Sequence, residues 1–278
     1  MMARVRVHHL SCATICHPGG RFWDGRAGVL RTARLVCHCL LLEAEDGLVL
    51  VDTGLGTADL AHPRRRLGPL WLAYSRPLLD PGQTALAQVR RLGFAAVDVR
   101  HIVLTHLDLD HAGGLSDFPS AQVHVLDVER AAAMQPPTTK EKRRYRQQQW
   151  EHQPRWVIHG GRGEQWMGFD AVAAINDVLL VPLHGHTRGH AGVAVRVGEQ
   201  WLLHCGDAYY FHAEIDPEPS CPRGLGAFQR LVAVDDRARR HNQARLRELR
   251  LSHGPEIRLV CAHDPLELRQ ATASVPAV

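Results

Sequence analysis

The sequence Thr105–Gly114, THLDLDHAGG, holds four metal-ligand side chains within six residues. It follows the apolar run Arg100–Thr105, which is typical of a short buried strand. The four side chains are His106, Asp108, Asp110 and His111. Alternate residues of an extended segment share a side, so the first three can converge, while the fourth turns to a neighbouring position as a helix begins. Imidazole and carboxylate ligands together suit zinc, iron, manganese or cobalt.

Three later segments also place a His or an Asp directly after an apolar run. They are Leu183–His190 (LHGHTRGH), Leu203–Tyr210 (LHCGDAYY) and Val260–Asp264 (VCAHD). Strand ends that project ligands to one rim are what a rigid multinuclear metal site requires. In the first segment His184 competes with His186 as a ligand, and the sequence GHT favours His186.

The order of apolar runs predicts an α/β fold in a single domain over residues 1–278. Leu35–Leu42 and Leu48–Val51 flank a polar, glycine-containing turn, which predicts a hairpin. Further strands are expected at 100–105, 121–126, 178–183, 191–197, 200–204 and 257–262, with helices at 84–93, 128–134 and 227–251. The N-terminal part is expected to form short strands and turns, and residues 57–81 to be rich in loops.

Two kinds of charged segment stand apart from this pattern. Residues 136–170 are basic and aromatic, and we expect an insertion on the edge of the domain rather than a part of its core. The arginine-rich stretches Arg64–Arg66 and Arg237–Arg240 are expected to be solvated faces.

The composition limits the class of protein and its partners. Of 278 residues, 45% are apolar and 22% charged, which is ordinary globular usage. The net charge of +4 argues against nucleic acid as the main partner. No apolar run approaches the roughly 20 residues that span a bilayer, and the N-terminus lacks the apolar core of a signal peptide, so we expect a soluble cytoplasmic protein with no membrane partner. Seven cysteines, an odd number, favour reduced structural thiols.

Five motifs in order resemble those of the metallo-β-lactamase-fold hydrolases. They are Val51–Gly54 (VDTG), the His106–His111 cluster, Gly185–His190 (GHTRGH), Gly206–Ala208 (GDA) and Ala262–Asp264 (AHD). The resemblance covers nearly the whole chain and is nearest to the acyl-homoserine-lactone lactonase-like branch. It implies an αββα four-layer sandwich of two mixed sheets, with a metal site at one rim.

The resemblance also implies two divalent metal ions, with zinc as the first expectation. One metal would be held by His106, Asp108 and His186, and the other by Asp110, His111 and His263, with Asp207 shared between them. Asp52 and His190 would support these ligands from behind.

Asp108 departs from the family pattern, which is His-x-His-x-Asp-His. A carboxylate in place of an imidazole adds negative charge, which favours iron, manganese or cobalt over zinc at that site. The alternative is a weak first site, with only one metal bound tightly.

The implied reaction is hydrolysis of an ester-type bond, with a lactone as the leading substrate. A hydroxide bridging two metals would attack the carbonyl carbon. Asp110 would orient that hydroxide and pass its proton to the leaving oxygen. Tyr210 would contact the substrate carbonyl, and Tyr209 is an equally available hydroxyl.

Aromatic residues could wall a pocket for a small-molecule substrate. The candidates are Phe22, Trp23, Trp71 and Trp150. The same residues could instead pack internally or form the face of a homodimer.

Other reactions are open within the same fold. A phosphodiesterase or nuclease would use the basic run Lys140–Arg146 to contact phosphates. A thioesterase resembling glyoxalase II and a mononuclear iron persulfide dioxygenase are further alternatives. Classical β-lactamase activity is disfavoured, since a bridging carboxylate such as Asp207 belongs to other branches.

Overall fold

Two six-stranded sheets form the centre of the molecule in the computed structural model, which describes residues 5–161 and 163–273. The first sheet contains, in spatial order, β1 (Arg6–Pro18), β2 (Thr32–Ala44), β3 (Gly47–Val51), β4 (Val99–Val103), β5 (Gln122–Leu126) and β6 (Arg155–His159). Strands β1 to β3 are antiparallel, and β3 to β6 are parallel. This sheet is therefore mixed, as predicted.

The second sheet is also mixed. Its order is β12 (Ile257–Val260), β11 (Gln200–His204), β10 (Ala191–Val197), β9 (Val178–Pro182), β8 (Phe169–Ile175) and β7 (Glu164–Trp166). Strands β11 and β12 are parallel, and the other pairs are antiparallel.

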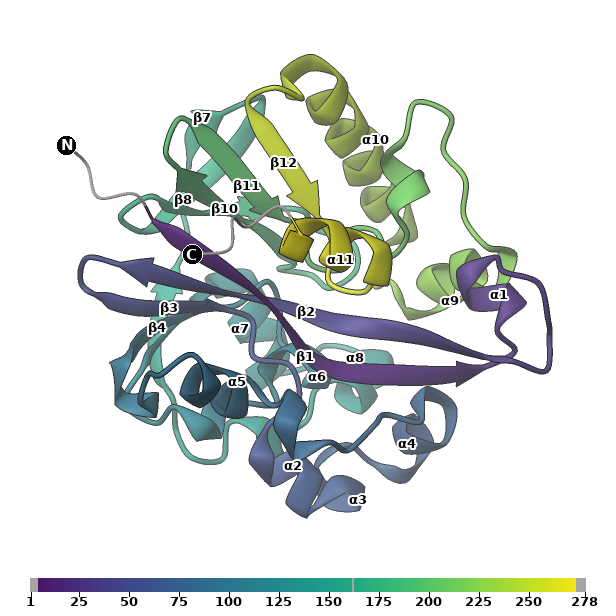
Figure 1. Cartoon of the computed structure of the whole chain (residues 1–278), viewed down its shortest axis with the longest axis horizontal. Coiled ribbons are helices and arrows are strands. Elements are labelled where there is room, and N and C mark those ends of the chain that lie inside the picture. Colours follow the sequence, from purple (N-terminus) through teal and green to yellow (C-terminus); the bar gives the residue numbers. More distant parts are fainter. Residues whose placement is uncertain (1–4, 162, 274–278) are drawn as a thin grey trace.

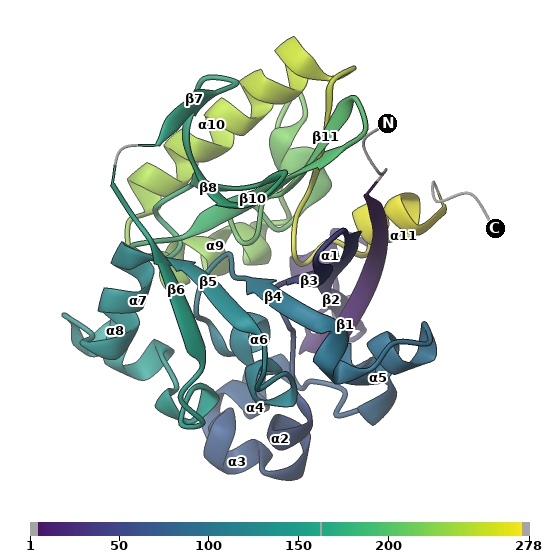
Figure 2. The ribbon, with the colours of Figure 1, turned by 90° about the vertical axis from the view of Figure 1, so that its left-hand side faces the viewer.

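Helices cover the outer face of each sheet and complete four layers (Figure 1, Figure 2). On the side of the first sheet lie α2 (Thr57–Ala61), α3 (Pro63–Arg66), α4 (Pro69–Ser75), α5 (Ala85–Arg91), α6 (Leu109–Ala112), α7 (Asp127–Met134) and α8 (Thr139–Arg144). Helix α10 (Asp236–His253) covers the second sheet. The remaining helices are α1 (Arg21–Asp24), α9 (Arg223–Val232) and α11 (Pro265–Ala273). None of the described helices is long and apolar enough to cross a membrane.

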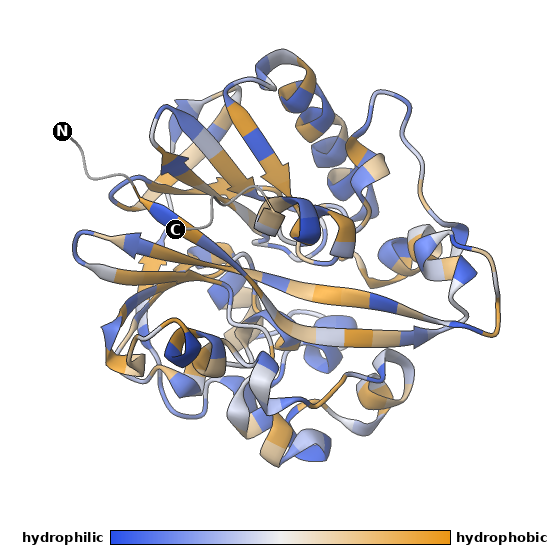
Figure 3. Ribbon diagram, in the orientation of Figure 1, coloured by the Kyte–Doolittle hydropathy of each residue, from blue (hydrophilic) through white to orange (hydrophobic). Residues whose placement is uncertain are grey.

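Continuous apolar runs build this sandwich because central strands are buried on both faces. In β2, Leu40 and Leu42 pack between the two sheets, whereas Leu41 packs under the helices that cover the first sheet. On the other side, Leu246 of α10 packs with Val181 of the second sheet. Figure 3 shows the apolar residues concentrated in the strands and polar residues along the outer helices.

The predicted hairpin and the helices at 84–93 and 128–134 are confirmed by β2–β3, α5 and α7. The prediction of short strands and turns in the N-terminal part is wrong, because β1 is a single strand of 13 residues. Residues 57–81 are not loops, since they contain α2, α3 and α4. These helices are only 4 to 7 residues long, too short to show a clear apolar period.

The helix predicted at 227–251 is interrupted between α9 and α10. There the backbone N–H groups of Val234 and Asp235 donate to the carbonyls of His186 and Gly185 (3.0 and 2.9 Å). The Asp235 side chain then caps α10 by accepting from the N–H of Ala238. The residues at the break bind the loop that carries His186. The interruption therefore depends on contacts with a distant segment, which the local sequence does not reveal.

The basic segments are less solvated than expected. Arg66 is buried and pairs with buried Asp59 at 2.6 Å, and Arg239 is also buried. In the segment 136–170, Tyr145 and Trp150 belong to the core beneath the first sheet. The expectation that this segment lies outside the core is therefore wrong for these residues.

Candidate metal centre

The predicted ligands follow strand ends that meet at one rim of the two sheets. His106 and Asp108 come after β4, and Asp110 and His111 lie in α6. His186 follows β9, Asp207 follows β11, and His263 follows β12. His186 is buried whereas His184 is exposed, so the loop turns His186 inward.

A first cluster consists of His106, Asp108, His186 and Asp207. Their ligand atoms all lie within 4.8 Å of one another. The Nε2 atom of His186 is 3.0 Å from Asp108 Oδ2 and 3.3 Å from Asp207 Oδ2. His106 Nε2 is 3.4 Å from the same Asp108 oxygen. The carboxylate at position 108 therefore stands where the family pattern has its second histidine.

A second cluster consists of His111, His263 and the same Asp207. The Oδ1 atom of Asp207 is 3.2 Å from His111 Nε2 and 3.1 Å from His263 Nε2. Asp207 thus directs Oδ2 to the first cluster and Oδ1 to the second. Asp110 is set further out, with Oδ2 at 3.9 Å from His263 Nε2.

Hydrogen bonds behind the imidazoles aim their Nε2 atoms into the centre. His111 Nδ1 donates to Asp52 at 2.8 Å, and His263 Nδ1 donates to the carbonyl of Val36 at 2.8 Å. Asp52 also accepts from the Thr105 hydroxyl, whose oxygen lies 2.9 Å from His106 Nδ1. Such partners fix both the tautomer and the orientation of a ligand histidine.

His190 holds the loop of Asp207 rather than the cluster itself. Its Nε2 accepts from the backbone N–H of Asp207 at 2.8 Å, and its Nδ1 donates to the carbonyl of Leu183 at 3.0 Å. Asp52 therefore lies behind His111, whereas His190 lies behind the backbone of Asp207.

The electrostatics couple the carboxylates to the imidazoles. Burial acts to raise the pKa of Asp207, but His263, His111 and His186 together hold that pKa well below its usual range. Burial acts to lower the pKa of His111, but Asp207 and Asp52 raise it well above its usual value. Without a metal, the carboxylates therefore stabilise protonated, positively charged imidazoles, and a bound cation would take the place of those protons.

Several buried polar atoms of the centre lack a hydrogen-bond partner among residues 5–161 and 163–273. They are His106 Nε2, His111 Nε2, His186 Nδ1, Asp108 Oδ1 and Asp207 Oδ1. An unpaired buried polar atom costs about 1–3 kcal/mol. The Nε2 and carboxylate oxygens that face one another are the donor set of divalent zinc and related ions, so the residues fit such a group.

The two neighbouring tyrosines face different ways. Tyr210 is buried, donates its hydroxyl hydrogen to Asp207 Oδ2 and stacks on the His263 ring at 4.7 Å. Tyr209 instead donates to Glu267 at 3.0 Å, inside the core of the second sheet. Tyr210 is therefore the hydroxyl at the centre.

Arg144 and Cys37 also reach the centre, although sequence reasoning placed neither there. Arg144 Nε lies 3.4 Å from Asp108 Oδ1, and its terminal nitrogens donate to the carbonyls of His186 and Val232, each at 2.6 Å. Cys37 groups with Asp110 and His263, and burial raises the pKa of its thiol to about 12. Arg144 sits in a run of five charged residues, which gave no sign that one of them points inward.

A cavity of about 480 Å³ opens onto the centre. Of the four aromatic residues predicted to line it, Trp71 does so, together with Tyr74 and Phe228. The prediction is wrong for the other three. Trp150 is buried in the core, Trp23 stacks on His17 at 3.7 Å outside the cavity wall, and Phe22 is 51% exposed. The aromatic residues of the sequence indicated that a pocket has an aromatic wall, but they did not indicate which of the rings line it.

Sequence comparison identifies a matching family model and relatives named as hydrolases. The model of the metallo-β-lactamase superfamily matches residues 32–262. The probable metallo-hydrolase Rv2300c of Mycobacterium tuberculosis is 44% identical over 265 residues, covering 94% of this chain and 81% of that protein. The N-acyl homoserine lactonase AttM of Rhizobium johnstonii is 29% identical over 186 residues, covering 61% and 64%.

Solved structures agree on the fold. A variant of Bacillus thuringiensis AiiA with N-decanoyl-L-homoserine at its active site has a TM-score of 0.71 and 20% identity, covering 97% of both chains. AidC, a dizinc quorum-quenching lactonase, has a TM-score of 0.63 and 15% identity, covering 95% of this chain and 89% of that one. Together with the matched sequence, this confirms the resemblance drawn from the motifs: the chain belongs to the metallo-β-lactamase superfamily.

Proposed function

We propose that this metallo-hydrolase cleaves an ester-type bond, with a lactone as its substrate class. The observation that carries the proposal is the placement of Asp207, whose two oxygens face two separate histidine clusters. A single-metal oxygenase would need only one such cluster. The names of AttM and AiiA-type relatives support a lactone.

The proposed metal ligands are the residues of the two clusters. His106, Asp108 and His186 would hold one divalent ion, His111 and His263 the other, and Asp207 would bridge them. Asp110 completes the second group as its outermost member. Divalent ions bound here would supply a hydroxide at neutral pH and polarise the scissile carbonyl.

Tyr210 would donate a hydrogen bond to the substrate carbonyl as its oxygen gains negative charge. Burial, together with Asp207, raises the pKa of this phenol well above its usual value, so it stays protonated and can donate at neutral pH. When substrate enters, the hydroxyl would exchange its Asp207 partner for the carbonyl oxygen.

Asp110 would carry the proton to the leaving oxygen. Its side chain is 13% exposed, lines the cavity and lies beside His263. A carboxylate at the boundary between buried ligands and open cavity can accept a proton from the nucleophile and deliver it to a departing alkoxide.

The cavity is of the size that small organic ligands occupy, and its walls include Trp71, Tyr74 and Phe228. A small-molecule substrate is therefore part of the proposal. A single domain, a homodimer and a cytoplasmic location remain predictions from the sequence.

A substrate panel tests the reaction class. The zinc-loaded protein is assayed with an N-acyl homoserine lactone, an aryl ester, a thioester and bis-p-nitrophenyl phosphate. We expect the highest kcat/KM for the lactone or the aryl ester. Turnover of the phosphodiester alone, or oxygen consumption with a persulfide, would contradict the proposal.

A further inference from the structure

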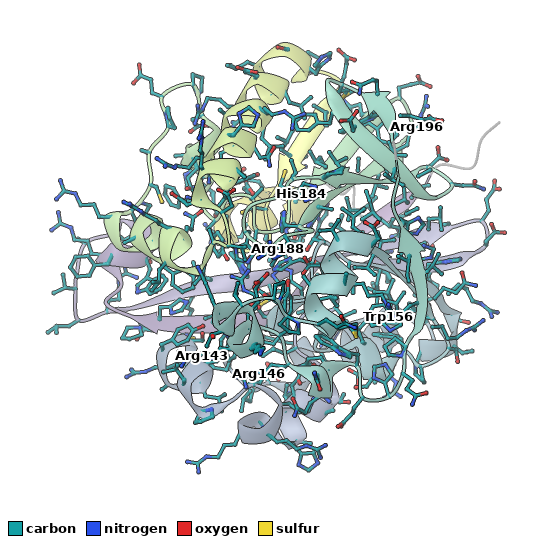
Figure 4. The ribbon with its side chains drawn as sticks, turned by 180° about the vertical axis from the view of Figure 1, so that it is seen from behind. Arg143, Arg146, Trp156, His184, Arg188 and Arg196 are labelled. Atoms are coloured by element: carbon teal, nitrogen blue, oxygen red, sulfur yellow. The ribbon has the colours of Figure 1, made fainter. Side chains whose placement is uncertain are left out.

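Arg143 and Arg146 line the cavity without a carboxylate partner among residues 5–161 and 163–273. The other cations of this segment are engaged. Lys140 donates to the carbonyl of Ala233, and Arg144 binds two carbonyls and faces Asp108. Figure 4 shows Arg143 and Arg146 next to one another on the side of the molecule opposite to that of Figure 1.

Arg146 has no carboxylate partner in the part of the chain that the structure describes, and it packs against the backbone. The side chain is half-buried, and its Nε atom is buried with no hydrogen-bond partner in the described part of the chain. Its guanidinium lies against Gly68, directly before α4, where a Cβ would collide with it. A buried donor nitrogen without a hydrogen-bond partner costs free energy. A bound anion would remove that cost.

The charges of the cavity as a whole point the same way. Four cationic side chains line it, Lys140, Arg143, Arg144 and Arg146, against the three carboxylates Asp108, Asp110 and Asp207. The carboxylates are the proposed metal ligands, and any divalent ion that they hold makes the cavity more positive. With divalent ions bound, the excess of positive charge would raise the local concentration of anionic ligands.

Apolar side chains line the same cavity beside these cations. Leu70 of α4 and Leu231 of α9 are 75% and 74% exposed, and both contribute to its wall with Phe228. Exposed apolar side chains grouped at a cavity offer a surface that an apolar ligand can cover. The cavity therefore combines an apolar wall with a cationic one.

We propose that the substrate of the hydrolytic site is an anionic amphiphile, an ester or lactone whose apolar chain carries a carboxylate or a phosphate bound by Arg143 and Arg146. This inference rests on the proposed function, since it names the substrate class of that reaction. The two arginines would select the substrate by its anionic group and would not act on the bond that is cleaved.

Matched esters test the inference in the zinc-loaded protein. The 4-nitrophenyl ester of octanoic acid is neutral, the mono-4-nitrophenyl ester of octanedioic acid ends in a carboxylate, and a third ester of the same length ends in a phosphate. We expect kcat/KM for the better anionic ester to exceed that for the neutral one by about tenfold or more, and the excess to shrink with added salt. The ester with the higher kcat/KM shows whether the two arginines prefer a carboxylate or a phosphate.

Charge variants assign the preference to its residues. The double variant Arg143→Gln/Arg146→Gln should bring the anionic-to-neutral ratio of kcat/KM close to one. The double lysine variant should keep part of the preference, because it retains charge without the planar guanidinium. Lys142→Gln is the matched control, since Lys142 is exposed on the same helix and does not line the cavity. It should keep the full ratio.

Calorimetry with amide analogues of the neutral and carboxylate esters separates the two proposals, since amides bind without turning over. If no ester is hydrolysed but the anionic amide binds more tightly in an arginine-dependent way, the proposed reaction is wrong, whereas the assignment of Arg143 and Arg146 as the anion-binding residues stands. If esters are hydrolysed with no anionic preference, or with a preference that the glutamine variant retains, the inference is overturned.

Discussion

The two clusters of the metal centre share Asp207 but are held by different parts of the molecule. In the second cluster, His111 and His263 are oriented through Nδ1 by Asp52 and by a carbonyl of β2. In the first cluster, the Nδ1 atom of His186 has no partner in the described part of the chain. Arg144 and the backbone N–H of Val234 fix His186 instead, through its carbonyl oxygen.

In the first cluster, His106 is oriented by Thr105, which follows β4, so it is His186 that depends on peripheral segments. Arg144 ends α8, and Val234 lies between α9 and α10. The first cluster also contains the unusual carboxylate of Asp108, whose charge faces the buried guanidinium of Arg144. We therefore expect changes in α8 to affect the first cluster selectively, and changes near Asp52 to affect the second most strongly.

The largest effect is expected where the clusters meet. Asp207→Asn removes the charge and an anionic oxygen from both, so bound metal should fall in both clusters and kcat should fall by more than about 100-fold, the upper figure for losing a group that only supports a ligand. Metal content and lactone turnover measure this. Asp46→Asn, in the exposed turn between β2 and β3, is the control. A metal-replete, active Asp207→Asn protein would refute the bridging role.

Arg144→Met tests the dependence of the first cluster on α8. It leaves Asp108 without its buried cation, which should lower the free energy of unfolding of the metal-free protein by about 3 kcal/mol. The loss should be smaller in zinc, since the metal then neutralises Asp108. Urea denaturation of both forms measures the change, with Lys142→Met as the exposed control. Equal losses in both forms would show that Arg144 acts only on folding.

Asp52→Asn tests the second cluster. The amide cannot accept strongly from His111 Nδ1, so the ring loses its fixed tautomer, and zinc affinity there should fall about 10- to 100-fold. Competition with a chelator measures the zinc affinity of each of the two sites. An unchanged affinity at both sites would mean that Asp52 does not orient a ligand.

The smallest effect on the metal centre is expected from imidazoles outside both clusters, which act on stability instead. Burial, followed by the charges of His159 and His101, lowers the pKa of His124 to about 4. The unfolded chain therefore binds a proton that the folded one does not, and His124 makes stability decline as pH falls from 6.5 towards 4, by at most about 1.4 kcal/mol per pH unit.

The variant His124→Gln should reduce that decline, whereas exposed His62→Gln should not. Urea unfolding between pH 7 and 4.5 measures the slope. An unchanged slope in His124→Gln would exclude this histidine as its source.

The contrast between residues at strand ends and residues in peripheral segments also explains which features the sequence could predict. The convergence of the candidate ligands was predictable because their segments follow apolar strands, and those strand ends meet at one rim. Arg144 was not, since its inward turn depends on carbonyls of His186 and Val232 that lie 42 and 88 residues away. Likewise, Trp150 and Tyr145 look like any aromatic residue of a basic segment until the core beneath the first sheet closes around them.

The central claim is that both clusters hold a metal through Asp207. Anomalous diffraction at the zinc edge from crystals of the zinc-loaded protein tests it most directly. We predict two peaks per chain, one among His106, Asp108 and His186 and one between His111 and His263, with an Asp207 oxygen ligating each. A single peak, or two peaks with Asp207 bound to only one, would contradict the account.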